Sequence, residues 1–444
     1  MRSSSKHIRN KKILFTFIVV VIFIPFIQQN VKLFSEHKLR GAYKLAEKPE
    51  FSMKKWVSGE YQVEAQTFVK DNFGFRPTFV RIYNQMYYNF YNIAKANGVI
   101  IGKDNYLFEE NYIKAHLGLD FIGEKAIREK VFKIKKIQDT LATKGIDLIV
   151  MLAPGKASFN PEYIPDKFFI NRNDSTNYSY YKKEIEANDI KLLDFNKWFI
   201  DLKDTIRYKL FPKNGIHWSV YAQAMVTDSL FKYFNDVLPT KGFPNLELYN
   251  ISKSFEMRNE EQDIENGMNL VVDIPDIEMS YPTVKVVNRG GIVKEPKLLT
   301  IGDSYYWGII KLANSKGLLS KSSFWFYNKQ VFPYSDSIDL KVEDIDVQSE
   351  IEQNDVILLM ATDANLYKFA YGFIDNVYDI YYTKLEDRVW YKKEQRILSY
   401  MKIMRDDPKQ NQQIKEKALK NNVLFEEELR SNAKYMIWVE NGKP

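Results

Sequence analysis

Residues 297–308 read Lys-Leu-Leu-Thr-Ile-Gly-Asp-Ser-Tyr-Tyr-Trp-Gly, and the interpretation of the whole chain starts from this stretch. Its short apolar run is typical of a buried strand, and the residues after Trp307 have the composition of a helix. Gly302 permits a sharp turn between the two, so Ser304 falls at a helix N-terminus. Free backbone N–H groups and the helix dipole favour a developing negative charge there. The pattern predicts either a serine nucleophile or, more simply, a helix cap formed by Asp303 or Ser304.

Strand and helix patterns alternate on both sides of this stretch. Strands are expected at residues 146–152, 190–195, 298–301, 323–327 and 355–360, and helices at 124–144, 178–187, 196–206 and 219–237. Such alternation predicts an α/β fold with a mostly parallel sheet covered by helices on both faces. Sites in these folds lie at the carboxyl ends of strands. The sequence places four polar side chains near such ends: Ser304, Lys156, Asp194 and Asp363.

The regions around this alternation complete a division into four parts. We expect residues 31–96 to be helical, with a polar stalk at 32–48, and a β-hairpin to follow near 98–108. Residues 240–295 are polar and predict an irregular excursion with short strands. The predicted parts are a cytoplasmic tail and signal-anchor helix (1–30), a stalk with a helical and hairpin region (31–120), the α/β domain (121–365) and a helical C-terminal extension (366–444).

The N-terminus combines a cationic segment with an apolar run. The chain carries a formal charge of +7, and five of these charges lie in the first twelve residues, which leaves +2 for the rest and no basis for nucleic-acid binding. Residues 13–27 read ILFTFIVVVIFIPFI, with no small-residue cleavage site after them. We therefore expect an uncleaved single-pass anchor in the inner membrane, with the bulk of the chain in the periplasm or another extracytoplasmic space. A cleaved signal peptide and a buried core helix are the alternatives.

A serine nucleophile needs a general base, and histidine is the obvious one here. The chain has four histidines and no cysteine, so thiol nucleophiles, disulfides and thiolate metal sites are excluded. Two histidines lie in the tail and the stalk. His217 stands just before a predicted helix, next to Gly215 and Trp218, and is the strongest candidate, with His116 as a weaker one. Because no carboxylates cluster with the histidines, we expect no metal and no cofactor.

Several short motifs occur in the order found in a known family. They lie at residues 56–60, 72–76, 81–85, 101–108, 152–156, 161–165, 215–218 and 302–304. On these motifs the chain resembles, over roughly residues 50–365, the AlgX/AlgJ group of alginate O-acetyltransferases, which carry an SGNH-hydrolase-like domain. In that group the histidine block precedes the serine block, the reverse of ordinary SGNH hydrolases, and this chain has the same order.

The resemblance implies a mechanism for the two candidate residues. His217 would take the proton from Ser304, which would accept an acetyl group and pass it from an acyl-enzyme to a polysaccharide hydroxyl. Because acetyl-CoA is cytoplasmic, the resemblance also implies an MBOAT-type membrane acyltransferase as a partner that supplies acetyl. The family's triad aspartate falls on Gly215, so the third member is unknown, and Asp194 and Asp363 are candidates to replace it.

Two alternatives remain open. A carbohydrate acetylesterase would use the same serine and histidine with water as the acceptor. A non-catalytic relative that binds polysaccharide or assists its assembly is favoured by the missing carboxylate at Gly215.

Overall fold

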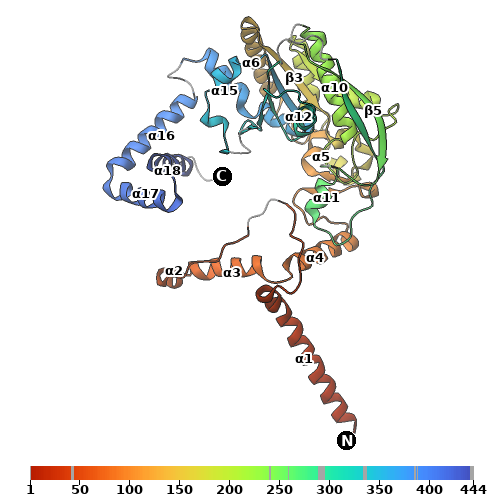
Figure 1. The fold of residues 1–444 in the computed structure, drawn as a ribbon, viewed down its shortest axis with the longest axis vertical. Helices are drawn as coiled ribbons and strands as arrows, with labels where there is room; N and C mark the ends of the chain where they lie inside the picture. Colours follow the sequence, from red (N-terminus) through yellow and green to blue (C-terminus); the bar gives the residue numbers. More distant parts are fainter. Residues whose placement is uncertain are drawn as a thin grey trace.

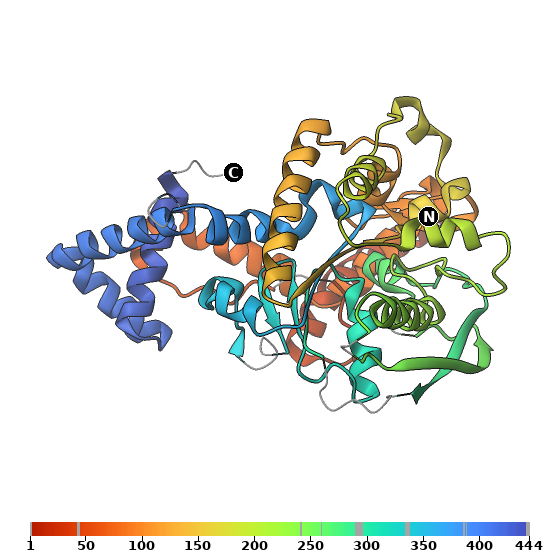
Figure 2. The same ribbon diagram turned by 90° about the horizontal axis from the view of Figure 1, so that it is seen from above.

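The body of the molecule is an α/β core, with one long helix projecting from it and three helices at its side (Figure 1). The computed structural model describes residues 2–41, 45–239, 242–258, 260–288, 296–333, 338–384, 387 and 389–440. Seen from above in Figure 2, the C-terminal helices form a lobe beside the core.

The core is built on a six-stranded sheet in the order β4-β3-β10-β7-β8-β9. The first five strands run parallel, and β9 pairs antiparallel with β8 at the edge. The strands are β3 (Asp147–Ala153), β4 (Leu192–Asp194), β7 (Leu298–Gly302), β8 (Ser323–Phe326), β9 (Gln330–Phe332) and β10 (Val356–Thr362). All five predicted strands lie in this sheet, so the expected mostly parallel α/β fold is confirmed.

Both faces of the sheet are covered, because alternate side chains of each strand point to opposite sides. On β3, Ile149 and Met151 belong to one apolar cluster, and Leu148 and Val150 belong to the other. The first cluster is closed by α9 (Phe195–Leu202), α10 (Val220–Val237) and α12 (Tyr306–Ser315). The second is closed by α6 (Glu124–Thr143), α8 (Asn177–Ala187) and α15 (Phe373–Tyr382). Burial on both faces explains why the central strands are almost continuously apolar.

The excursion after α10 is more regular than the sequence predicts. It contains two ten-residue antiparallel strands, β5 (Asn245–Ser254) and β6 (Met279–Asn288), instead of short ones. Leu246 and Val284 are buried against the core, while Glu247, Lys253 and Lys285 are exposed. A short helix, α11 (Asp263–Met268), lies between the two strands in sequence.

The N-terminal region differs from the expectation of a helix from residue 31 onward. In the described part of residues 32–52 the backbone is not helical, and Arg40 donates its backbone N–H to Asn269 Oδ1 at 2.7 Å. Helices follow as α2 (Met53–Ser58), α3 (Glu60–Asn72) and α4 (Arg76–Tyr91). The predicted hairpin is present as β1 (Val99–Ile101) and β2 (Leu107–Glu109), and it leads into α5 (Glu110–His116).

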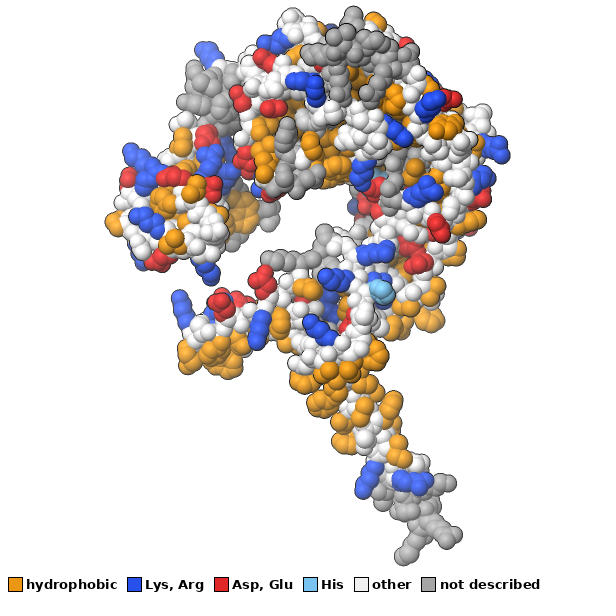
Figure 3. Space-filling model, in the orientation of Figure 1, with side chains coloured by type: hydrophobic (Ala, Val, Ile, Leu, Met, Phe, Trp, Pro, Cys, Tyr) orange, Lys and Arg blue, Asp and Glu red, His pale blue; other side chains and the backbone are white. Residues whose placement is uncertain are grey.

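The projecting helix α1 (Arg2–Val31) is apolar over residues 13–27, between its cationic free end and the body of the molecule. Residues 9–31 are long and apolar enough to cross a membrane, and they fit a single-pass anchor or a signal sequence. Figure 3 shows this helix standing clear of the body, with hydrophobic side chains on the part nearer the body and Lys and Arg side chains toward its free end.

The C-terminal extension is helical, as expected. Helices α16 (Val389–Asp406), α17 (Pro408–Asn421) and α18 (Phe425–Glu440) enclose an apolar cluster of their own, separate from the clusters of the sheet.

Candidate active site

Ser304 lies in the turn between β7 and α12, at the carboxyl edge of the sheet. The turn is held by Asp303, a fully buried carboxylate. Its Oδ2 accepts from the backbone N–H and the hydroxyl of Thr362, both at 2.8 Å, and from Asn365 Nδ2 at 2.9 Å. Its Oδ1 accepts from the backbone N–H of Tyr305 at 3.2 Å. Asp303 therefore fixes the turn, and no side-chain hydrogen bond caps α12, so the hydroxyl of Ser304 is left for another partner.

That partner is His217. The ring nitrogen Nε2 lies 2.8 Å from Ser304 Oγ, although the residues are 87 positions apart in sequence. The imidazole packs against the ring of Tyr305 at a centroid distance of 4.9 Å, and the Tyr305 hydroxyl donates to the carbonyl of Ile216 at 2.5 Å. The structure thus brings together the two residues that the sequence singled out, within the hydrogen-bond reach that a nucleophile and its base require.

Asp263 completes a triad that the sequence did not predict. Its Oδ2 lies 2.5 Å from His217 Nδ1, and its Oδ1 accepts from the backbone N–H of Ile216 at 2.8 Å. The side chains of His217 and Asp263 are 15% and 27% exposed, so the pair is sheltered yet reachable. A carboxylate on the second imidazole nitrogen fixes the tautomer that leaves Nε2 free to accept a proton from Ser304.

The two acids proposed from the sequence to fill this role have other partners. Asp194 ends β4, accepts from Tyr178 and Lys182, and caps α9 through the backbone N–H of Lys197. The fully enclosed Asp363 accepts from the Ser158 hydroxyl, and burial raises its pKa to about 7. Both predictions for the orienting acid are therefore wrong, because each carboxylate is bound at its own strand end.

Gly215 explains why the acid comes from elsewhere. A Cβ at this position would lie 2.6 Å from the carbonyl oxygens of Glu260 and Glu261. The backbone leading to Asp263 therefore occupies the space that a side chain at residue 215 would need. The only signal for Asp263 is an acid-rich run, Glu-Glu-Gln-Asp at 260–263, and nothing in its spacing distinguishes one acid from the next.

Electrostatics around His217 support a role as a base. Burial is the largest contribution and opposes protonation, but the hydrogen bond and the charge of Asp263 together outweigh it. The pKa of His217 consequently lies above its usual value of 6.5. The charges of Glu260 and Asp303 raise the pKa of His217 further. Glu109, at the end of β2, is in turn affected by the charge of Asp263. Burial raises the pKa of Glu109, and the charge of Asp263 raises it further.

Lys156 supports the loop that carries His217. It is fully buried, and its Nζ donates to the carbonyls of Lys213 and Gly215, both at 2.7 Å. Burial holds the pKa of Lys156 well below its usual value. The sequence placed this residue at a strand end, and the structure adds the contact that ties that strand end to the histidine loop.

Tyr327 is a second residue that sequence reasoning missed. It follows β8, and its backbone N–H donates to the carbonyl of Gly302 at 2.9 Å. Burial raises the pKa of Tyr327 and the neighbouring side chain and backbone N–H of Ser304 lower it, with burial the larger effect, so the group is a neutral phenol near pH 7. A neutral donor beside the serine N–H is suited to stabilise an oxyanion.

His116, the weaker histidine candidate, ends α5, and burial lowers its pKa to about 4.

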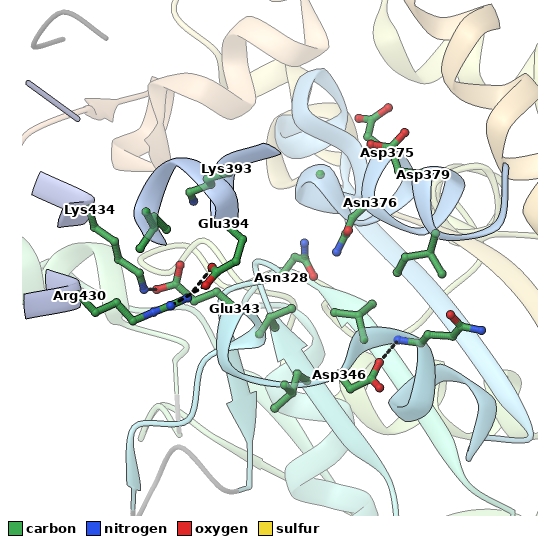
Figure 4. Close-up of a pocket in the computed structure, with 17 residues that line it drawn as sticks. Asn328, Glu343, Asp346, Asp375, Asn376, Asp379, Lys393, Glu394, Arg430 and Lys434 are labelled. Atoms are coloured by element: carbon green, nitrogen blue, oxygen red, sulfur yellow. Dashed lines mark hydrogen bonds and ion pairs between the residues drawn. The ribbon is translucent and has the colours of Figure 1, made fainter. Parts of the chain in front are cut away.

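A cavity of about 860 Å³ lies beyond Tyr327, between the core and the C-terminal helices (Figure 4). Its lining begins at Asn328 and combines apolar side chains with charged and amide ones. On the far side, Arg430 pairs with Glu394 at 2.7 Å and Lys434 pairs with Glu343 at 3.1 Å. The close-up shows that Arg430 and Lys434 extend from the C-terminal lobe toward these carboxylates. The cavity therefore offers charged and amide groups that can bind hydroxyls, and its lining includes Asn328, the residue that follows Tyr327 in sequence.

Comparison with known proteins bears on the region that holds the histidine. Residues 99–241 match the family described as SGNH hydrolase-like domain, acetyltransferase AlgX. This range contains His217 and ends before Asp263 and Ser304. A probable alginate O-acetylase AlgJ from Pseudomonas putida is 23% identical over 132 residues, which cover 30% of this chain and 33% of that protein. The chain thus spans about a third of the length of the curated relative it matches.

Two solved structures are also similar. The O-acetyltransferase domain of Pseudomonas putida AlgJ has 17% identity, a TM-score of 0.41, and coverage of 64% of this chain and 99% of that one. Pseudomonas aeruginosa AlgX has 13% identity, a TM-score of 0.40, and coverage of 66% and 69%. The family match and the AlgJ relative carry the conclusion: the fold is SGNH-like, and the predicted resemblance to the AlgX/AlgJ-like acetyltransferases is confirmed.

Proposed function

We propose that this chain is a membrane-anchored extracytoplasmic O-acetyltransferase that moves acetyl groups onto a cell-surface or secreted polysaccharide. The observation that carries the proposal is His217, held between Ser304 at 2.8 Å and Asp263 at 2.5 Å. A serine, a histidine and an orienting carboxylate in this contact form the arrangement used for acyl transfer on unrelated folds. The similarity to AlgX/AlgJ-like proteins supports acetyl as the group transferred.

The residues fit the two halves of such a reaction. In the first half, Ser304 Oγ attacks the acetyl carbonyl while His217 Nε2 takes the hydroxyl proton, and the donor's leaving group departs with that proton. In the second half, a sugar hydroxyl loses its proton to His217 and attacks the acetyl-serine; the bond between acetyl and Ser304 Oγ breaks, and His217 returns the proton to Oγ, which restores Ser304. Asp263 stabilises the imidazolium formed in each half, and the backbone N–H of Ser304 with the Tyr327 hydroxyl receives the oxyanion.

The setting of the site fits a polymer acceptor and an external donor. The cavity that begins at Asn328 gives sugar hydroxyls carboxylate, amide and cationic partners close to Tyr327. An anchor at α1 would hold the site outside the cytoplasm, so acetyl must be delivered across the membrane. An MBOAT-type acyltransferase is the partner that we propose for this delivery.

Asp263 also bears on the alternatives. The case for a non-catalytic relative rested on the lack of a carboxylate at Gly215, and Asp263 supplies that carboxylate from another segment. An acetylesterase would use the same three residues, with water in place of the sugar hydroxyl.

One assay separates these functions. The purified full chain is incubated with an activated acetyl ester, with and without an oligosaccharide acceptor, and released acetate and acetylated acceptor are both measured. A transferase produces acetylated acceptor at the expense of free acetate. Free acetate alone, whatever the acceptor, identifies an esterase. Turnover no higher than that of Ser304→Ala contradicts both enzymatic functions.

A further inference from the structure

An exposed apolar stripe runs along α4, the helix between the projecting anchor and the core. It consists of residues at helical spacing on one face: Phe79, Ile82, Tyr83, Met86 and Phe90. Met86 is 51% exposed and Phe90 is 75% exposed. Large apolar side chains repeated over three turns are costly in water and mark a surface that binds something apolar.

The opposite face of α4 already has a partner. Asn84 is buried and donates to the carbonyl of Met268 at 2.7 Å, and Arg81 donates to the carbonyl of Leu270 at 3.1 Å. Gln85 Oε1 accepts from the backbone N–H groups of Val271 and Val272. These contacts fix α4 on the core just beyond α11. The apolar stripe is therefore the outward face of a firmly held helix.

The start of α4 is also fixed against the end of α1. Gly74, just before α4, packs directly against α1. A Cβ on Gly74 would collide with the carbonyl oxygen of Pro25 and with the side chain of Gln28. The rings of Phe34 and Phe75 lie 5.9 Å apart, and Glu36 accepts from the backbone N–H of Phe75 at 3.0 Å. In Figure 1, α3 and α4 lie across the inner end of α1 instead of continuing it. A bilayer crossed by α1 would have its surface at this level.

A second apolar patch lies on α2. On α2 and the residue before its cap, Phe51, Met53, Trp56 and Val57 are exposed, and Phe51 and Trp56 pack together at 5.9 Å. Figure 3 shows these hydrophobic side chains on the side of α2 from which α1 projects, with charged side chains on the other side. Aromatic rings beside cations are typical of a membrane interface, and Lys95 Nζ lies 3.9 Å from the ring centroid of Tyr87 on α4.

From these observations we propose that α2 and α4 lie on the surface of the bilayer, with the apolar stripe of α4 inserted at the level of the lipid headgroups. Contact of α2 and α4 with the bilayer holds the core at a fixed height and orientation beside the membrane. A single flexible anchor would not do so. The proposal rests on the membrane anchoring by α1 proposed above and not on the chemistry at Ser304.

Site-directed labelling can test this inference because the chain contains no cysteine. An environment-sensitive fluorophore is attached to the cysteine of the full chain that carries Ile82→Cys. The labelled chain is reconstituted in nanodiscs that hold one copy each, and their lipids carry a nitroxide quencher at the level of the headgroups. Lys125→Cys on α6, whose native side chain is 91% exposed, is the matched control. We expect a blue-shifted, strongly quenched label at residue 82 and a solvent-like, unquenched label at residue 125. Adding Met86→Asp to the Ile82→Cys chain should remove most of the quenching, because a carboxylate resists insertion.

Each other outcome overturns the inference. A label at residue 82 that is as solvent-exposed as the control leaves no lipid contact. A shielded label that lipid nitroxides do not quench means that another part of this chain, and not lipid, covers the stripe on α4. A chain that does not enter nanodiscs contradicts α1 as an anchor as well. Acetyl transfer by Ser304 is measured separately with a soluble donor, so its failure is distinguishable from all three.

Discussion

Lys156 Nζ donates to the backbone carbonyl of Gly215 at 2.7 Å from a fully buried position, two residues before the histidine of the site. This contact joins the end of β3 to the loop that carries His217. On the other side of that loop, Asp263 binds both the imidazole and the backbone N–H of Ile216. The catalytic histidine that we propose is thus positioned by two segments that are distant in sequence.

Replacement of the buried lysine should misplace the histidine without touching the substrate. We expect Lys156→Met to leave two carbonyls unpaired and to lower the free energy of unfolding by about 1–3 kcal/mol. The acetyl-transfer kcat should fall more than KM rises, because the loop geometry is lost. Denaturant unfolding and steady-state kinetics measure both. Lys125→Met, at an exposed lysine on α6, is the control and should change neither quantity.

Asp263→Asn should lower acetyl transfer by about 10³–10⁴-fold, since the amide favours the wrong imidazole tautomer. The pH profile provides an independent readout. Activity needs neutral His217, so it rises with pH through the histidine pKa, which Asp263 raises. Without that charge, burial dominates and the pKa falls, so the acid limb of the residual activity should move to lower pH. An unchanged limb, or one displaced to higher pH, would show that Asp263 does not act on His217. Asp273→Asn, at an exposed acid on the same segment, should leave the profile unchanged.

Tyr327→Phe should reduce kcat by about 10²-fold with little change in KM, because the hydroxyl acts on the oxyanion and not on the ground state. The ring contact with Tyr371 at 5.0 Å remains in this variant, so folding should be preserved. Steady-state kinetics with an activated ester provides the test. A loss confined to KM would instead place Tyr327 in substrate binding.

Gly215→Asp restores the residue type that the family pattern has at this position, and we expect it to damage the protein. Its Cβ would meet two carbonyl oxygens at 2.6 Å, so the strain should cost about 1–3 kcal/mol of stability. It should also fail to rescue Asp263→Ala. The matched control is Gly267→Ala within α11, where a Cβ meets nothing within 4 Å. Rescue of Asp263→Ala by Gly215→Asp would refute the structural account of this loop.

Features that depend on local sequence patterns could be predicted, whereas features that depend on contacts between residues far apart in sequence could not. The apolar runs of β3, β7 and β10 predicted the sheet, because burial on both faces requires such runs. The turn at Ser304 and the helix after His217 were recognisable from local patterns, and so was the pairing of these two residues as a chemical hypothesis. Gly215 correctly indicated that the acid does not come from the position two residues before the histidine.

Asp263 and Tyr327 could not be identified in the same way. Asp263 reaches the site only because β5 and β6 pair with each other and return the chain to the histidine loop. Tyr327 is brought to Ser304 by the register of β8 beside β7. Both placements depend on strand pairing over long separations, and a single sequence with several acids and 29 tyrosines gives no local signal for either.

The central claim is that Ser304 carries the acetyl group, and trapping of the acyl-enzyme tests it most directly. The full chain is mixed with an activated acetyl ester, quenched in acid within the first turnover, digested and analysed by peptide mass spectrometry. We predict one acetyl group on the peptide that contains residue 304, and none on this peptide in Ser304→Ala. In His217→Ala the acetyl group should accumulate no faster than in the ester-only background. In the native chain it should be lost when an oligosaccharide acceptor is added. Acetylated acceptor formed by the Ser304→Ala chain at the native rate would contradict the account.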